Sequence, residues 1–189
     1  MRLFVAIEIP DSWRSIASAT NEIIGASVGA LNANMRFVDP SLMHITLRFL
    51  GEVPEERVAD LDAALRHRLR PIEVGLALGS PSTFGPPTHT QVVWLGVRGN
   101  VEGLRVLVRR VDLALADAGV KPNDTRFSPH ITLARLDRHV SADDRRQIAE
   151  LVGFLPPPQA FPMRVRSVAL VRSTLGGARP VYDVIKRYS

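Results

Sequence analysis

The sequence predicts an α+β protein made of two similar lobes, and three observations lead to that prediction. Predicted strands often follow one another directly instead of alternating strictly with helices, which argues against a doubly wound sheet. Residues 36–51 and 126–136 resemble each other, because both contain Arg-Phe, then a proline, then an identical His-Ile-Thr-Leu. Of the 189 residues, 46% are apolar and 23% are charged, as in an ordinary globular protein. A duplication at a single spacing predicts two lobes related by a pseudo-two-fold axis within one bilobal domain, residues 1–189.

Alternation of apolar and polar residues, together with β-branched content, predicts the strands. They are expected at Arg2–Ile9, Met35–Val38, His44–Leu50, Ile72–Gly79, Gln91–Val97, Ser128–Arg135, Met163–Arg172 and Val181–Arg187. Two proline-rich stretches, Ser80–Thr90 and Leu155–Pro162, are interpreted as loops that do not separate independent domains.

Apolar residues at helical spacing predict the helices. These are expected at Asp11–Gly29, Pro54–Arg70, Val101–Ala118 and Ser141–Val152. The second opens with Pro-Glu-Glu, which suits a first helical turn. Gly119 is placed to end the third helix, and Ser141, with two aspartates close behind it, is placed to cap the fourth.

The composition excludes several classes of protein. The sequence has no cysteine, so disulfides, thiolate metal sites, iron–sulfur clusters and cysteine nucleophiles are ruled out. No apolar run reaches the roughly 18 residues that a membrane span needs. Residues 1–10 are typical of a first strand and not of a signal peptide. We therefore expect a cytoplasmic protein without a membrane association.

The charge balance favours an anionic partner. The chain has 24 basic and 19 acidic residues, a net charge of +5, which suits a polyanion such as RNA. Among the basic residues only Lys121 and Lys186 are lysines, and neither lies in a nucleotidyl-transfer motif or a phosphate-binding loop. ATP-driven chemistry is therefore not expected.

The repeated tetrapeptide carries the candidate chemistry. Side chains two residues apart in a strand share a face, so His44 and Thr46 point one way while Ile45 points the other way. His130 and Thr132 repeat this arrangement in the second lobe. If the pseudo-two-fold axis brings the two strands side by side, the two pairs face each other across a cleft.

Two imidazoles and two hydroxyls around one point fit phosphodiester chemistry. An imidazole with a pKa near ~6.5 can be neutral in one copy and take a proton from water, while the protonated copy donates to the leaving oxygen. The threonine hydroxyls can bind the non-bridging phosphate oxygens. A two-histidine metal site is a weaker alternative, because neither motif has a carboxylate or a third histidine at ligand spacing. A duplicated motif that serves only the fold is the other alternative.

On these motifs the sequence resembles the two-histidine phosphoesterases, and specifically the bacterial and archaeal RNA 2′,3′-cyclic phosphodiesterases, also called the 2′-5′ RNA ligase family. The resemblance covers almost the whole chain. It is carried by Arg2–Ile7, Asp39–Val53, Val93–Val97, Phe127–Arg135, and by Ser173, Leu175, Gly177 and Tyr182 near the C-terminus. A short tail after Tyr182 departs from the family pattern.

The resemblance implies antiparallel sheets lining a central cleft, with the helices outside. It also implies hydrolysis of RNA or nucleoside 2′,3′-cyclic phosphates to 2′-phosphomonoesters without a metal, ATP or another cofactor, with reversible 2′-5′ joining of RNA ends as a side activity. Carried over by position, His44 is expected to be the proton donor and His130 the proton acceptor. Thr46, Thr132 and Arg135 are expected to bind the phosphate. A monomer is the default expectation.

The cleft contribution of two arginines depends on the local course of their strands. Under strict alternation Arg135 lies on the face opposite His130, and it reaches the phosphate only if the strand ends or bulges there. Arg48 shares the face of His44 under the same rule, although a solvated charge at the rim is the simpler expectation.

Aromatic and histidine residues outside the motifs leave further alternatives. Phe84, in a Gly-Pro-Pro loop, is a candidate for stacking a nucleobase, or else an anchor of its loop. Trp94 is expected in the core. Two histidines, His67 and His139, are expected on the surface, while His89 lies close enough to the Phe84 loop to be considered for the cleft.

Two other functions compete with a cyclic phosphodiesterase. One is an RNA- or nucleotide-binding module with little turnover, against which both intact His-x-Thr pairs argue. The other is a phosphodiesterase for 2′-5′ linkages or for other cyclic phosphates.

Overall fold

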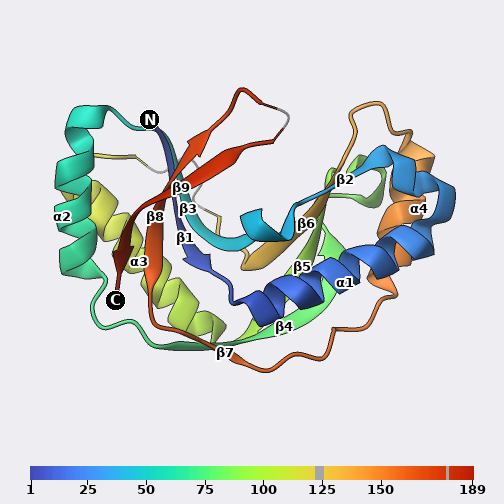
Figure 1. Ribbon diagram of the computed structural model, residues 1–189, viewed down its shortest axis with the longest axis horizontal. Helices are drawn as coiled ribbons and strands as arrows, with labels where there is room; N and C mark the ends of the chain where they lie inside the picture. Colours follow the sequence, from blue (N-terminus) through green and yellow to red (C-terminus); the bar gives the residue numbers. More distant parts are fainter. Residues whose placement is uncertain (122–125, 178) are drawn as a thin grey trace.

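A computed structural model describes residues 1–121, 126–177 and 179–189, which form one antiparallel sheet of nine strands and four α-helices (Figure 1). The strands are β1 Arg2–Glu8, β2 Met35–Phe37, β3 His44–Glu52, β4 Val74–Thr83, β5 Val92–Gly99, β6 His130–Leu136, β7 Met163–Val165, β8 Val168–Thr174 and β9 Val181–Tyr188. The α-helices are α1 Asp11–Val28, α2 Val58–Arg68, α3 Val101–Asp117 and α4 Ala142–Gly153. Short 3-10 turns are η1 Gly29–Asn34, η2 Pro40–Leu42, η3 Glu55–Arg57 and η4 Pro87–His89.

The order of the strands makes the two predicted lobes visible. The sheet runs β7-β4-β5-β6-β3-β1-β8-β9, and β2 adds to β6. Strands β3 and β6, which carry the repeated tetrapeptides, are therefore the central pair, with three further strands on each side. They join through Ile45 opposite Ile131. The predicted α+β fold with two pseudo-symmetric lobes is confirmed, and one continuous sheet connects the lobes.

The helices lie outside the curved sheet (Figure 1). Helices α2 and α3 pack on each other beside β3 and β9, whereas α1 and α4 cover the half that contains β4 and β6. Helix α1 therefore follows β1 in the chain but packs on the other lobe, which ties the two halves together. The main core lies under the central strands, where Ile45 and Ile131 are fully buried.

One predicted strand is in fact two. Met163–Arg172 is expected to be continuous, but β7 pairs with β4 at one edge of the sheet and β8 pairs with β1 in the other lobe. Only two polar residues, Arg166 and Ser167, separate the segments, and so short an interruption does not by itself predict that the chain changes lobes there. Strand β8 is buried on both faces, with Val168 and Leu170 in the main core and Ala169 and Val171 in a small second cluster.

Strand β4 continues farther than the proline content of residues 80–90 predicts. It runs to Thr83 and includes Pro81, which lies where the pairing with β5 is irregular. A proline is tolerated at such a bulge because a ladder hydrogen bond is already missing there. The interpretation of residues 80–83 as loop is therefore wrong.

The helix ends follow the expected chemistry. The Ser141 hydroxyl accepts a hydrogen bond from the Asp144 amide at 3.1 Å, which caps α4. Gly119 follows α3 with a φ of +65°, and its amide donates to Ala116. The second helix begins later than predicted, because η3 takes the first turn after Pro54. None of the helices in the described part of the chain combines the length and apolar character that a membrane crossing requires.

Candidate active site

The pairing of β3 with β6 brings the two repeated motifs to one face of the sheet. With Ile45 opposite Ile131 in an antiparallel register, Thr46 comes to lie opposite His130, and His44 opposite Thr132. The isoleucines point into the core, so these four polar side chains share the other face, where all of them are half-buried. The two histidines therefore occupy symmetric places about the local two-fold axis, as the sequence predicts.

Each imidazole is fixed by a backbone carbonyl two residues before it. The Nδ1–H of His44 donates to the Leu42 oxygen at 2.7 Å, and the Nδ1–H of His130 donates to the Ser128 oxygen at 2.7 Å. A carbonyl can only accept, so both rings carry a proton on Nδ1. In the neutral ring Nε2 is then an acceptor, and in the charged ring it is a donor. Within the part of the chain that the structure describes, no hydrogen bond engages either Nε2, which leaves this nitrogen available for proton transfer.

Aromatic rings flank both histidines. The His44 ring lies 4.9 Å from Phe4 and 5.4 Å from Tyr182, between ring centroids. His130 lies 4.8 Å from Phe84 and 6.2 Å from Trp94. These apolar neighbours exclude water and restrict the orientation of the imidazoles.

The expectation that Trp94 lies in the core is wrong. Its neighbours Val93 and Leu95 are fully buried on the core side, so alternation turns Trp94 to the face of His130, where its ring lies 5.1 Å from Phe84. Among the residues that the structure describes, no side chain or backbone group accepts a hydrogen bond from its buried Nε1–H. Strand alternation alone could have identified this position.

Burial is the main reason why the pKa of each histidine lies below the ordinary value of 6.5. The hydrogen bond to Leu42 raises the pKa of His44, whereas the charge of a protonated His130 and the charge of Arg14 lower it further. For His130 the additional cause is Arg135, against the hydrogen bond to Ser128. Both imidazoles are consequently neutral in the free protein near pH 7.

A β-bulge turns Arg135 back to the cleft face. In the pairing of β5 with β6, Val93 is opposite Ala134 and Trp94 is opposite Thr132, so Leu133 is an extra residue. Ala134 is fully buried in the core, and Arg135 is exposed on the same face as the histidines. This is the condition under which the sequence predicts that Arg135 can reach the phosphate.

The first lobe contains the same bulge with different residues after it. Leu47 is the extra residue in the pairing of β1 with β3. The bulge turns Arg48 away from His44, so the expectation of a shared face or a solvated rim charge is wrong. Arg48 is 7% exposed and forms a two-point ion pair with Asp112 of α3, at 2.6 and 2.9 Å.

Phe49 is thereby the counterpart of Arg135, five residues after its histidine. It is 45% exposed and lies 6.0 Å from Phe4, between ring centroids. None of the predictions from the sequence includes Phe49, Phe4 or the ring contact of Tyr182 with His44. Only the equal spacing of Phe49 and Arg135 after their histidines could have indicated the first of these.

A cleft of about 250 Å³ opens beside His130. Its lining residues come from β3, from the loop after β4 and from the segment before β6: Thr46, Leu47, Arg48, Phe49, Phe84, Arg126, Phe127, Ser128 and His130. Phe84 is thus a wall of the cleft as well as a neighbour of His130. The lining of this cleft combines three phenylalanines with Arg48 and Arg126, and Arg135 lies farther along β6.

The remaining histidines lie outside this cleft. His67 and His139 are exposed, as expected. His89 is also exposed, and its Nδ1 lies 2.9 Å from the Thr88 hydroxyl. Within residues 1–121, 126–177 and 179–189, no group of three or more His, Asp or Glu side chains is arranged to hold a metal ion.

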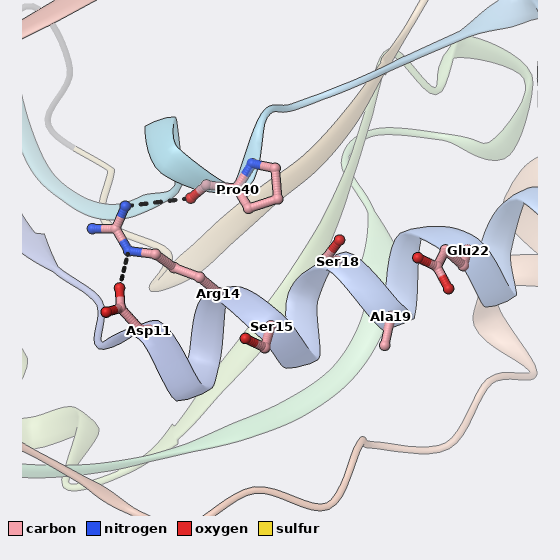
Figure 2. Close-up of a pocket in the computed structure, with 7 residues that line it drawn as sticks. All are labelled: Asp11, Arg14, Ser15, Ser18, Ala19, Glu22 and Pro40. Carbon is pink, nitrogen blue, oxygen red and sulfur yellow. Dashed lines mark hydrogen bonds and ion pairs between the residues drawn. The ribbon is translucent and has the colours of Figure 1, made fainter.

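A second hollow, of about 500 Å³, lies between α1 and η2, and Figure 2 shows its lining. It contains Asp11, Arg14, Ser15, Ser18, Ala19, Glu22 and Pro40. This set contains no histidine, and among the described residues no hydrogen bond joins its serines to its carboxylates. Arg14 nevertheless connects the two places, because it reaches the turn that precedes His44 (Figure 2).

Comparisons with known proteins agree with this geometry. The profile of the 2′-5′ RNA ligase superfamily matches residues 35–177. Among proteins called RNA 2′,3′-cyclic phosphodiesterase, that of Thermus thermophilus is 34% identical, with 100% of this chain and 90% of the relative covered. That of Methanothermobacter thermautotrophicus is 31% identical, with 96% and 95% covered.

Solved structures show the same fold. A crystal structure of a Thermus thermophilus protein has a TM-score of 0.74 and 28% identity, with 100% of this chain and 97% of that chain covered. Escherichia coli LigT complexed with 3′-AMP has a TM-score of 0.73 and 28% identity, with 99% and 96% covered. The family identified from the paired motifs is confirmed by these comparisons: the chain belongs to the 2′-5′ RNA ligase superfamily.

Proposed function

We propose that this protein hydrolyses 2′,3′-cyclic phosphates of RNA ends or nucleosides to 2′-phosphomonoesters, without a metal ion or ATP. The observation that carries the proposal is the symmetric pair of imidazoles on β3 and β6, each locked through Nδ1 and free at Nε2. Relatives called RNA 2′,3′-cyclic phosphodiesterase, similar over nearly their full length, support the same substrate class.

The reaction needs one proton acceptor and one proton donor on opposite sides of the phosphorus. His130 takes a proton from water at Nε2 as the water oxygen bonds to phosphorus. The bond from phosphorus to O3′ breaks, and His44 gives its Nε2 proton to O3′, which leaves a 2′-phosphate. Thr46, Thr132 and Arg135 hold the non-bridging oxygens, where charge increases in the transition state.

The unequal surroundings of the histidines support this assignment of roles. Arg135 lies close enough to His130 to lower its pKa, which favours the neutral, accepting form. The residue at the equivalent place of the first motif is the uncharged Phe49. Arg14 also lowers the pKa of His44 and keeps its charge while it binds backbone carbonyls, so the donor role of His44 requires the bound phosphate to raise that pKa. An anionic phosphate bound between the rings raises both pKa values and can charge His44 before the reaction.

The aromatic cleft supports a nucleoside as the group attached to the phosphate. Phe84 and Phe49 offer flat apolar surfaces beside His130, and nucleobases stack on such rings. Replacing water by the 5′-hydroxyl of a second RNA end gives a 2′-5′ linkage by the same proton transfers, so reversible joining is the expected side activity.

Histidine substitutions test the proposal. His44→Ala and His130→Ala should each lower kcat on a nucleoside 2′,3′-cyclic phosphate by about 10²–10⁴, while their circular dichroism stays unchanged. The activity of the wild type should be insensitive to EDTA. His67→Ala, an exposed histidine on α2, is the matched control and should be fully active. Normal turnover in either site variant would reject the mechanism. Tight RNA binding without turnover in the wild type would instead identify a binding module.

A substrate with a sulfur in place of O3′ separates the two roles. A thiolate leaves without a proton donor, so this substrate should restore His44→Ala but not His130→Ala. Restoration of His130→Ala alone would reverse the assignment. Release of a 3′-phosphate from the ordinary substrate would mean that the ribose binds in the opposite direction.

A further inference from the structure

The side chain of Arg14 is tied to the turn that precedes His44. Arg14 lies in the first turn of α1, with its side chain 24% exposed. Its Nη1 donates to the Ser41 oxygen at 2.8 Å and to the Pro40 oxygen at 3.4 Å, while Nε donates to the Ile9 oxygen at 3.2 Å. Figure 2 shows this reach from α1 across to Pro40.

Most of these contacts are to backbone carbonyls. The carboxylate of Asp11 lies 3.6 Å from the Arg14 Nε and is itself fully exposed, so it contributes little. A guanidinium whose N–H groups donate hydrogen bonds to the carbonyls of two separate segments holds those segments together. Here the segments are the β1–α1 connection at Ile9 and the η2 turn.

The η2 turn is the support of the His44 ring. Its last residue, Leu42, provides the carbonyl that accepts the Nδ1–H of His44. The turn itself is a single 3-10 unit, closed by the Leu42 amide on Asp39 at 2.9 Å and by the side chain of Asp39 on the Ser41 amide at 3.0 Å. So short a turn has little stability of its own. Its geometry therefore depends on what it is attached to.

We propose that Arg14 is a positioning residue for His44, because it holds the Pro40–Leu42 turn in the geometry in which the Leu42 carbonyl fixes the His44 ring. The proposal rests on the proposed function, in which His44 donates the proton to the leaving oxygen. Without this support the turn can shift, the Nδ1 hydrogen bond weakens, and Nε2 no longer points steadily at the phosphate.

The charge of Arg14 provides a second signature of the same contact. The charged and titratable groups around His44 are Arg14 of α1, His130 of β6, Tyr182 of β9 and Glu8, its neighbour on β1. Glu8 is engaged with Arg187 at 2.6 Å. Removing the Arg14 charge should thus raise the pKa of His44 and leave that of His130 unchanged.

Two substitutions separate the effect of the Arg14 hydrogen bonds to the turn from the effect of the Arg14 charge. Arg14→Met removes both, and we expect kcat to fall about 10- to 100-fold with a smaller change in KM, as for the loss of charge-assisted hydrogen bonds. Arg14→Lys keeps the charge, but its single ammonium cannot reach both Ile9 and Ser41. It should keep the low pKa of His44 and recover only part of kcat. Ser15→Ala, in the same hollow but exposed, is the matched control and should behave as the wild type.

NMR of the histidine rings gives a readout that does not need activity. In the wild type, ¹⁵N shifts should report His44 with its proton on Nδ1, and in Arg14→Met a mixture with the Nε2–H form, while His130 stays as it is. Unchanged His44 tautomer, titration and kcat in Arg14→Met would overturn the inference, even if the variant were less stable. Full activity of His44→Ala would reject the proposed function instead, and the tautomer measurement would still decide the role of Arg14.

Discussion

Arg145 of α4 is a buried arginine whose removal should destabilise the fold strongly. It is 9% exposed, and its guanidinium donates to the carbonyls of Val140 at 3.0 Å, Asp137 at 2.7 Å and Arg138 at 3.2 Å, as well as to that of Thr90. Thr90 is fully buried and follows η4. The side chain therefore joins α4 to the loop after η4 and to the loop between β6 and α4.

The loss in Arg145→Met can be worked out from these contacts. The Thr90 and Val140 acceptors lie in buried surroundings, and a buried acceptor left without a donor costs about 1–3 kcal/mol, so two cost about 2–6 kcal/mol. Removing a charge from the interior offsets part of this loss. We expect the free energy of unfolding to fall by about 2–4 kcal/mol, which lowers Tm by roughly 4–16 °C in a chain of this length.

Urea and thermal unfolding of Arg145→Met measure this loss. Arg146→Met is the matched control one residue along α4, because Arg146 is exposed and its partner is the exposed Asp143 at 2.9 Å. It should change stability by less than about 0.5 kcal/mol. Equal stability of Arg145→Met and Arg146→Met would show that the buried carbonyls find other donors, and the reasoning would fail.

Four further results are expected. Both site histidines have lowered pKa values, so the unfolded chain binds more protons than the folded one below pH 6.5. The free energy of unfolding should therefore fall as the pH drops from about 7.5 to 5.5, and it should fall less in a His44→Ala/His130→Ala variant. Equal losses in urea titrations of the two proteins would contradict this. Arg135→Met should raise the pKa of His130 in an NMR titration and increase KM for a cyclic phosphate, and an unchanged titration would place the Arg135 charge elsewhere. Phe84→Ala should weaken the binding free energy of a nucleoside cyclic phosphate by about 1–3 kcal/mol. It should change that of glycerol 1,2-cyclic phosphate little, because this ligand has no base. Equal losses for the two ligands would argue against stacking. A single bilobal domain should unfold with equal calorimetric and van't Hoff enthalpies, whereas two transitions would separate the lobes.

Much of the site could be predicted from the sequence because it depends on local rules. Strand alternation puts His44 with Thr46 and His130 with Thr132 on common faces, whatever the rest of the chain does. The repetition of the motif indicates the two-fold relation, and the pairing of Ile45 with Ile131 is its consequence. The catalytic roles of these side chains stay predictions until the variants are measured.

Other features depended on pairings between distant segments. The bulges at Leu47 and Leu133 arise from the register with β1 and β5. They decide that Phe49 and Arg135 share the face of the histidines while Arg48 pairs with Asp112. One extra residue reverses the face of every later side chain, and no local propensity records it.

The sequence alone therefore determined the fold class, the family and the two imidazole–hydroxyl pairs, because these follow from strand alternation and from a motif that is repeated in the chain. Only the tertiary structure decided that the rings of Phe4, Tyr182, Phe84 and Trp94 surround the imidazoles. It likewise decided the division of one predicted strand between β7 and β8, and the hydrogen bonds of Arg14 to the η2 turn. These are contacts between segments far apart in the chain. Their geometry is set by how two curved halves of one sheet pack against their helices, and a linear pattern does not contain that information.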